Sequence, residues 1–356
     1  MGESRAMSAV RVLAGALSLL AATLVPGPGK AVAGDGSGPC GDLESITVPS
    51  GAVTCTHGAD PLEALTGHHH PHGADDPAHS DGDLLPVDPD GTGPHAAAPQ
   101  GIHCYGDGRD GNRVQAVYAV PSDRDDRYGE VVDDIRRWAA ETDSVFASSA
   151  APYGATRHVR FVTEGACRLV VDRLVLSPVA DDNFRATVTE LMAHGYHRPD
   201  RRYLVWMDSD VLCGIGQFHR DERTGGNRDE RTAGNVNDGV GAGLVARVDT
   251  PCWGLLPGRG TSVEAHELVH TLGGVNLSAP HATPLGHCTD DGDVMCYEDA
   301  PLTRLQDVCP PEGDALLDCN GDDYFHPHPP TGSYLATHWN VADSSFLATT
   351  VGTVAP

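Results

Sequence analysis

Basic residues are scarce in this 356-residue chain, which has 24 Lys and Arg against 50 Asp and Glu and a formal net charge of −26. The only lysine is Lys30, close to the N-terminus. An acidic surface repels the phosphates of nucleic acids and the headgroups of anionic lipids. We therefore expect neither nucleic acid nor a membrane as a partner. The acidic surface would serve solubility, or the binding of calcium or of cationic substrates.

No apolar run of the sequence is long enough to cross a bilayer comfortably. The short run 12–25 follows Arg5 and Arg11 and precedes the small residues Ala-Val-Ala that end at Ala33. A positive start, a short apolar run and a small-residue cleavage site are typical of a secretion signal. We expect residues 1–33 to be removed near Ala33, leaving a soluble, monomeric protein outside the cell.

The sequence also has no C-x-x-C pair, which argues against a zinc ribbon or a thioredoxin-type site. All ten cysteines follow the signal, and an even number in an exported protein predicts disulfides. The spacing makes 288–296 and 309–319 plausible local bridges.

Between residues 34 and 100 the chain is poor in apolar periodicity and crowded with Asp, Pro, Gly and His, including the run 68–72. This composition predicts a disordered segment or a pro-region. We favour a solvated linker over metal capture as the role of its histidines.

Regular structure is expected from about residue 101. Alternating or continuous apolar residues predict strands at 114–120, 203–207 and 244–248. Helical spacing predicts helices at 128–146 and 184–194, the second capped by Asp181 or Asp182. Strands that alternate with helices indicate an α+β or α/β layered fold, and we expect α+β.

The chemistry of the chain is concentrated in residues 261–274, TSVEAHELVHTLGG. Residues four apart lie on one face of a helix, so His266 and His270 can bind one metal ion while Glu267 holds a water. Zinc prefers neutral imidazole nitrogens and keeps a position for water in catalytic sites. The motif therefore predicts a zinc site with Glu267 as its base.

The residues His266-Glu267-Leu-Val-His270-Thr-Leu-Gly273 resemble the first part of the metzincin signature, H-E-x-x-H-x-x-G-x-x-H. The later segment 293–297, Asp-Val-Met-Cys-Tyr, is similar to the Met-turn of that family. The resemblance implies a twisted sheet with a backing helix and the active-site helix in an upper part, 101–274. An irregular, disulfide-bearing lower part, 275–356, would follow.

The third histidine of the metzincin signature is replaced by Asn276, whose neutral amide is a poor zinc ligand. His287 and His281 both follow before Met295, as if after an insertion. His287 precedes Met295 by the eight residues found in one metzincin branch, so it is the favoured third ligand and His281 the alternative. Tyr297 would then stabilise the oxyanion, as the resemblance implies.

These residues predict a secreted zinc metalloendopeptidase that acts on protein or peptide substrates. Segment 34–100 could cover its active site, with Cys40 or Cys55 as a temporary zinc ligand unless these two pair together. The alternating oxygen side chains of Asp318, Asn320 and Asp322 could in addition bind Ca²⁺ or form a plain acidic turn.

Two other readings stay open. In a gluzincin a glutamate from a later helix is the third ligand, and the only nearby candidate, Glu298, lies in a proline-bearing loop. Alternatively, the chain is a non-catalytic exported module that binds zinc or a partner. Glu267 argues against this second reading, because a structural zinc site needs no base.

Overall fold

The computed structural model describes Cys40, residues 43–48, Gly51, residues 53–60 and 101–218, Gly234, and residues 243–254, 262–309 and 316–354. The expected signal 1–33, the histidine run 68–72 and most of segment 34–100 lie outside these residues. No helix among the described residues has the length and apolar character needed to cross a bilayer.

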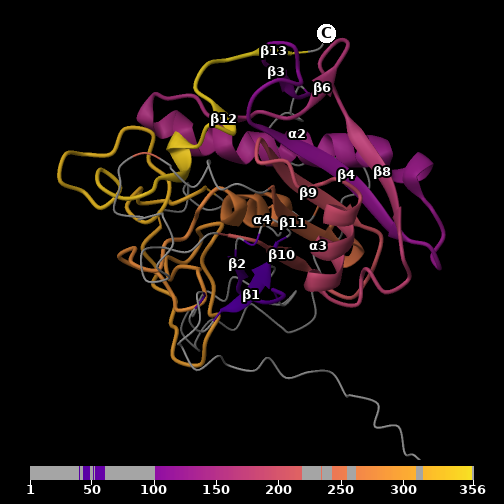
Figure 1. Ribbon diagram of the computed structural model, residues 1–356. Coiled ribbons are helices and arrows are strands. Elements are labelled where there is room, and N and C mark those ends of the chain that lie inside the picture. Colours follow the sequence, from indigo (N-terminus) through magenta and orange to yellow (C-terminus); the bar gives the residue numbers. More distant parts are fainter. Residues whose placement is uncertain are drawn as a thin grey trace, which may run out of the picture. The chain divides into compact units, whose positions relative to one another are not determined.

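A five-stranded mixed sheet with the order β10-β11-β9-β4-β8 forms the centre of the fold (Figure 1). Its four parallel strands are β4 (Arg113–Pro121), β8 (Val171–Leu176), β9 (Arg201–Met207) and β11 (Leu244–Asp249). The edge strand β10 (Gly214–Gly216) pairs antiparallel with β11. The mixed sheet agrees with the expected α+β class.

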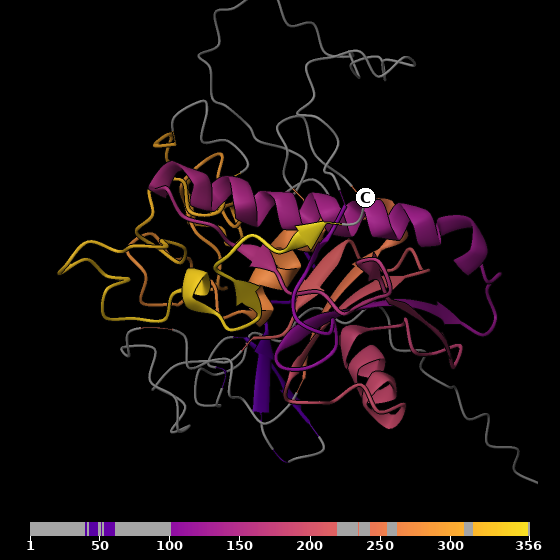
Figure 2. The same cartoon turned by 90° about the horizontal axis from the view of Figure 1, so that it is seen from above.

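Helices cover both faces of this sheet, with α2 and α3 on opposite sides (Figure 2). On one face, α2 (Tyr128–Ala150) and α4 (Val263–Thr271) pack against Tyr118, Leu204 and Trp206. On the other, α3 (Phe184–Ala193) packs against the alternate residues Ala119, Tyr203 and Val205. Strands β4, β9 and β11 are buried on both faces, which explains their nearly continuous apolar runs.

The predicted helices and strands are confirmed with small shifts. Helix α2 continues to Ala150, four residues beyond the predicted end, and α3 ends at Ala193. The predicted cap of α3 is wrong, because Asn183 accepts the hydrogen bond from the Ala186 N–H at 3.0 Å. Asp181 instead accepts a hydrogen bond from the hydroxyl of Ser209 at 2.8 Å.

Four two-stranded sheets complete the regular structure. They pair β1 (Glu44–Thr47) with β2 (Val53–Thr56), β3 (His103–Cys104) with β13 (Thr353–Val354), β5 (His158–Val159) with β12 (Leu347–Ala348), and β6 (Thr163–Glu164) with β7 (Arg168–Leu169). Short 3-10 helices lie at Ala151–Tyr153, Thr250–Cys252 and Val341–Asp343. The described part of 275–356 is mostly irregular, as expected for the lower part.

All ten cysteines are paired. The pairs 288–296 and 309–319 confirm the expected local bridges, and the other three are 40–55, 104–167 and 213–252. The suggestion that Cys40 or Cys55 is a temporary zinc ligand is wrong, since both sulfurs are in one disulfide. Five disulfides are compatible with an extracellular protein.

Candidate metal centre

Helix α4 begins and ends where the sequence indicates, and both ends are fixed by the sheet. Ser262 is its N-cap, with the hydroxyl accepting from the Ala265 N–H at 3.2 Å. Glu264 in the first turn is buried and accepts hydrogen bonds from Trp206 Nε1 at 3.1 Å and from the Gly254 N–H at 2.8 Å. Gly273, at φ 97°, turns the chain in the left-handed conformation that glycine tolerates best.

The structure brings His287 to His266 and His270. The three ring centroids form a triangle with sides of 5.0, 5.1 and 5.2 Å. All three side chains and Glu267 are completely buried. Two of these candidate ligands come from one helix, and His287 comes from the irregular lower part.

Each of these histidines is oriented by an acceptor at its Nδ1. His266 donates to the Val294 carbonyl at 2.8 Å, His270 to the Gly274 carbonyl at 3.0 Å, and His287 to Asp299 Oδ2 at 3.0 Å. A carbonyl oxygen only accepts, so the proton lies on Nδ1 and Nε2 carries a lone pair. This is how metal-binding histidines are held in proteins.

The lone pairs of these rings have no hydrogen-bond partner within the described residues. The unpartnered buried atoms include Nε2 of His266, His270 and His287 and both carboxylate oxygens of Glu267. Burying that many unsatisfied polar atoms would cost several kcal/mol, at about 1–3 kcal/mol each. A metal ion that accepts the nitrogen lone pairs removes much of that cost, so these residues fit a metal such as zinc.

The electrostatic setting keeps the imidazoles of His270 and His287 neutral. Burial lowers the pKa of His287 to about 4, against the opposing hydrogen bond to Asp299. Burial and the surrounding imidazoles also hold the pKa of His270 well below its usual value. A neutral ring is the form that binds a metal, so both rings are ready to do so at neutral pH.

Glu267 lies beside edge strand β10. A Cβ atom built on Gly214 would lie 2.0 Å from Glu267 Oε1, and one on Gly216 would lie 2.8 Å from His270 Cβ. Glycines at both positions therefore let α4 approach the edge strand closely. The only signal of this contact in the sequence is the short pattern Gly-Ile-Gly at 214–216.

The segment that resembles a Met-turn lies directly beneath His266. The Met295 N–H donates to Asp293 Oδ1 at 2.8 Å, the Cys296 N–H donates to the Asp293 carbonyl at 3.1 Å, and Val294 supplies the acceptor for His266. Tyr297 follows, with its ring centroid 4.2 Å from that of His287. The turn thus positions a ligand and places the phenol at the site.

The other candidate ligands lie elsewhere. His281 Nδ1 is 3.2 Å from Asp323 Oδ2 and 3.3 Å from Asp290 Oδ2, in an acidic loop. Asn276 donates to the Trp339 carbonyl at 3.1 Å. Glu298 faces Arg304, 3.8 Å away, at the exposed surface. Of the two histidines predicted as the third ligand, His287 is thus the one that lies at the centre.

The predicted calcium residues Asp318 and Asn320 make different hydrogen bonds. Asp318 is buried, and its carboxylate accepts backbone N–H groups from residues 322, 323, 324 and 325 at 2.6–3.0 Å. Asn320 donates its amide to Asp290 Oδ2 at 2.9 Å. Asp318 therefore organises its own loop, and a calcium ion there stays a prediction.

Two residues that the sequence did not reveal also point into the centre. His57 and Asp60 follow strand β2 near the N-terminus, and both side chains are buried. Asp60 Oδ2 lies 3.1 Å from His266 Nε2, and its Oδ1 accepts a hydrogen bond from Tyr297. His57 Nε2 and Asp60 Oδ2 also have no hydrogen-bond partner. A histidine and an aspartate in a polar, biased segment gave no signal of this position.

No protein-family model, curated protein or solved structure matches this chain significantly. The function must therefore be argued from the geometry of the centre.

Proposed function

We propose that the chain is a secreted zinc-dependent metalloendopeptidase with a metzincin-like catalytic domain. The observation that carries the proposal is the convergence of three buried, unpartnered imidazole nitrogens beside the unpartnered carboxylate of Glu267. A structural zinc site has no use for an adjacent base. A zinc ion held by His266, His270 and His287 would supply a Lewis acid for the scissile carbonyl and a water of lowered pKa.

The residues of the chain then divide the work of peptide hydrolysis. Glu267 accepts a proton from the water and donates it to the leaving nitrogen, a role that fits a carboxylate whose pKa is raised by burial and by Asp60. The hydroxyl of Tyr297, which donates to Asp60 here, can donate to the carbonyl oxygen of a bound substrate. The edge of β10, which bridges to Asp60 in the intact chain, is suited to pair with an extended peptide.

The centre is completely buried in the intact chain, so the test compares the full chain before and after a cut that can open it. A site-specific protease makes the cut at a recognition sequence inserted after Ser80. Glu267→Gln should keep one zinc per chain and lose about 10²–10⁴-fold in the hydrolysis of casein or a peptide. His266→Ala should lose both the bound zinc and the hydrolysis. Full hydrolysis by Glu267→Gln would refute the mechanism.

A second function has one observation in its favour. The three histidines are completely buried in the intact chain, and structural zinc sites are closed in this way. The alternative is therefore a non-catalytic exported module with the same zinc site. Zinc content without hydrolysis in both the intact and the cut chain would favour it.

A further inference from the structure

The described residues between 40 and 60 form a small unit, here called the N-terminal hairpin, made of β1, β2 and the 40–55 disulfide. It ends at the metal centre, which it contacts through His57 and Asp60.

Asp60 is close to two of the three histidines. Its Oδ2 is 3.1 Å from His266 Nε2, and its Oδ1 is 3.7 Å from His287 Nε2. Neither pair is hydrogen-bonded. Two atoms bound to one zinc ion at about 2.0–2.1 Å lie at most roughly 4.1 Å apart. Both distances are below that limit, as expected if one ion is shared.

His57 approaches from the other side. One of its ring nitrogens lies within 4.8 Å of a ring nitrogen of His270 and of His287, and its ring centroid is 4.4 Å from that of His270. Its Nδ1 is 3.0 Å from Asp60 Oδ1, which leaves Nε2 directed at the centre. Its Nε2 is also 3.9 Å from Glu267 Oε2. Without a cation, the carboxylates of Asp60 and Glu267 would be buried together.

The hairpin lies at the β10 edge of the central sheet, where an extended substrate peptide would pair (Figure 1). Cys55 and Phe218 exchange backbone hydrogen bonds of 2.9 Å in each direction, and the Asp60 N–H donates to the Gly214 carbonyl at 3.0 Å. These are antiparallel contacts, the kind that an extended peptide makes with an edge strand. The hairpin therefore occupies the place of a substrate.

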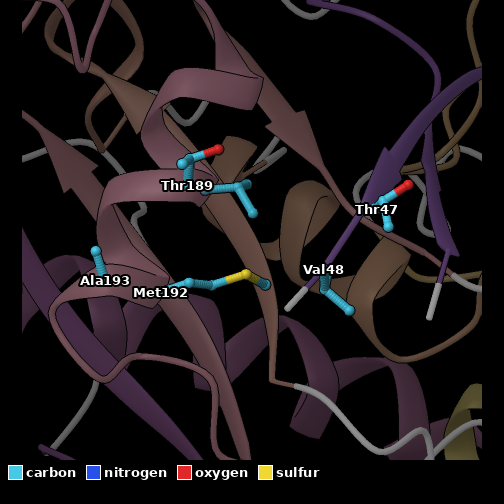
Figure 3. Close-up of a pocket in the computed structure, with 6 residues that line it drawn as sticks. Thr47, Val48, Thr189, Met192 and Ala193 are labelled. Atoms are coloured by element: carbon cyan, nitrogen blue, oxygen red, sulfur yellow. The ribbon is translucent and has the colours of Figure 1, made fainter. Parts of the chain in front are cut away.

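A second contact joins the hairpin to helix α3. Ile46 and Val48 belong to the same apolar cluster as Val188 and Met192 of that helix. Thr47 and Val48 line a hollow of about 290 Å³ together with Thr189, Met192 and Ala193 of that helix. Figure 3 shows Thr47 and Val48 on one side and the three helix residues on the other. The hairpin is thus docked on the domain with a gap in its packing, as a separable unit would be.

The covalent connections also allow the hairpin to leave. Its one disulfide, 40–55, is internal, and the other four join residues of 104–319. Only the chain between residues 60 and 101 ties it to the domain. A single cut there would free it.

We propose that His57 and Asp60 bind the metal in the intact chain, so that the N-terminal hairpin fills the water position and the substrate edge and keeps the peptidase latent. This inference rests on the proposed metal centre and names the regulation of that site. Cutting the chain between residues 60 and 101 would activate the enzyme.

The test uses cobalt-substituted full-length protein with acetohydroxamate, which binds a metal only where a position is open. Four forms are compared: the parent, the double variant His57→Phe/Asp60→Asn, the parent cut after Ser80 as above, and the control Thr56→Val. Phe keeps the ring of His57 against Phe218, and Asn keeps the size of Asp60. Thr56 is buried on the same strand and is not a ligand in this proposal.

Acetohydroxamate should change the visible spectrum of the double variant and of the cut protein at concentrations at least about 10-fold lower than for the parent. Removal of cobalt by EDTA should be at least about 10-fold faster for the double variant, since loss of even an outer partner of a ligand costs 10–100-fold. Thr56→Val should behave as the parent does.

Equal acetohydroxamate binding and equal cobalt release in all four forms would overturn the inference. Neither acetohydroxamate binding nor cobalt release depends on catalysis. The hairpin can therefore be refuted as a ligand without refuting the peptidase, and the reverse. An open site that appears only in the variant and the cut protein, without hydrolysis of any peptide, would support the hairpin as a ligand and refute the peptidase.

Discussion

Substituting Gly214 by Ala perturbs the proposed base through the edge strand rather than through the metal ligands. The added Cβ would lie 2.0 Å from Glu267 Oε1, 2.8 Å from Glu267 Cδ and 2.9 Å from Val263 Cγ1. Non-bonded atoms prefer roughly 3.5–4.0 Å, so the carboxylate or the helix must move by about 1 Å or more. The imidazoles of α4 make none of these contacts.

The expected cost of such overpacking is about 1–3 kcal/mol in the free energy of unfolding. At roughly 2–4 °C per kcal/mol for a domain of this size, the unfolding temperature should fall by about 2–12 °C. A misplacement of about 1 Å costs on the order of 10²-fold in rate. Peptide hydrolysis by the cut Gly214→Ala protein should fall by that factor, with zinc content unchanged.

Two glycine variants serve as comparisons. Gly129 lies in the first turn of α2, and nothing lies within 4 Å of an added Cβ, so Gly129→Ala should leave hydrolysis unchanged and stabilise the protein slightly, by up to about 1 kcal/mol. At Gly216 the Cβ would meet the Glu267 carbonyl at 2.9 Å, which moves the helix backbone, so zinc binding should weaken as well. Full hydrolysis by Gly214→Ala with normal zinc content would refute the placement of Glu267 as the base.

Two further predictions concern carboxylates around the centre. Asp299→Asn removes the carboxylate that accepts the hydrogen bond from His287, and it should weaken zinc binding about 10–100-fold in a chelator competition. Asp307 is exposed, so the control Asp307→Asn should leave zinc binding unchanged. Burial raises the pKa of Asp318 to about 7 and that of Asp323 to about 6, so the folded protein binds more protons there than the unfolded chain. Their contribution to stability is therefore complete below pH about 4 and is lost as the pH rises through about 7. In EDTA-treated protein, calcium should raise the unfolding temperature at pH 8 and not at pH 5, and no effect at pH 8 would count against a calcium site.

The sequence alone determined the parts of this protein that depend on local spacing. His266, Glu267 and His270 share a helix because a four-residue interval returns to the same helical face. The position of His287, eight residues before Met295, likewise sufficed to prefer it over His281. Strands β4, β9 and β11 of the central sheet followed from apolar runs, since parallel strands in the middle of a sheet are buried on both faces.

Only the tertiary structure decided what lies opposite those residues. Gly214 and Gly216 border Glu267 and His270 because β10 lies against α4, and nothing near either segment in the sequence signals that approach. His57 and Asp60 reach the centre because the N-terminal hairpin pairs with the sheet edge about 150 residues later in the chain. Contacts between distant segments depend on the packing of whole elements, and a local pattern carries no record of them.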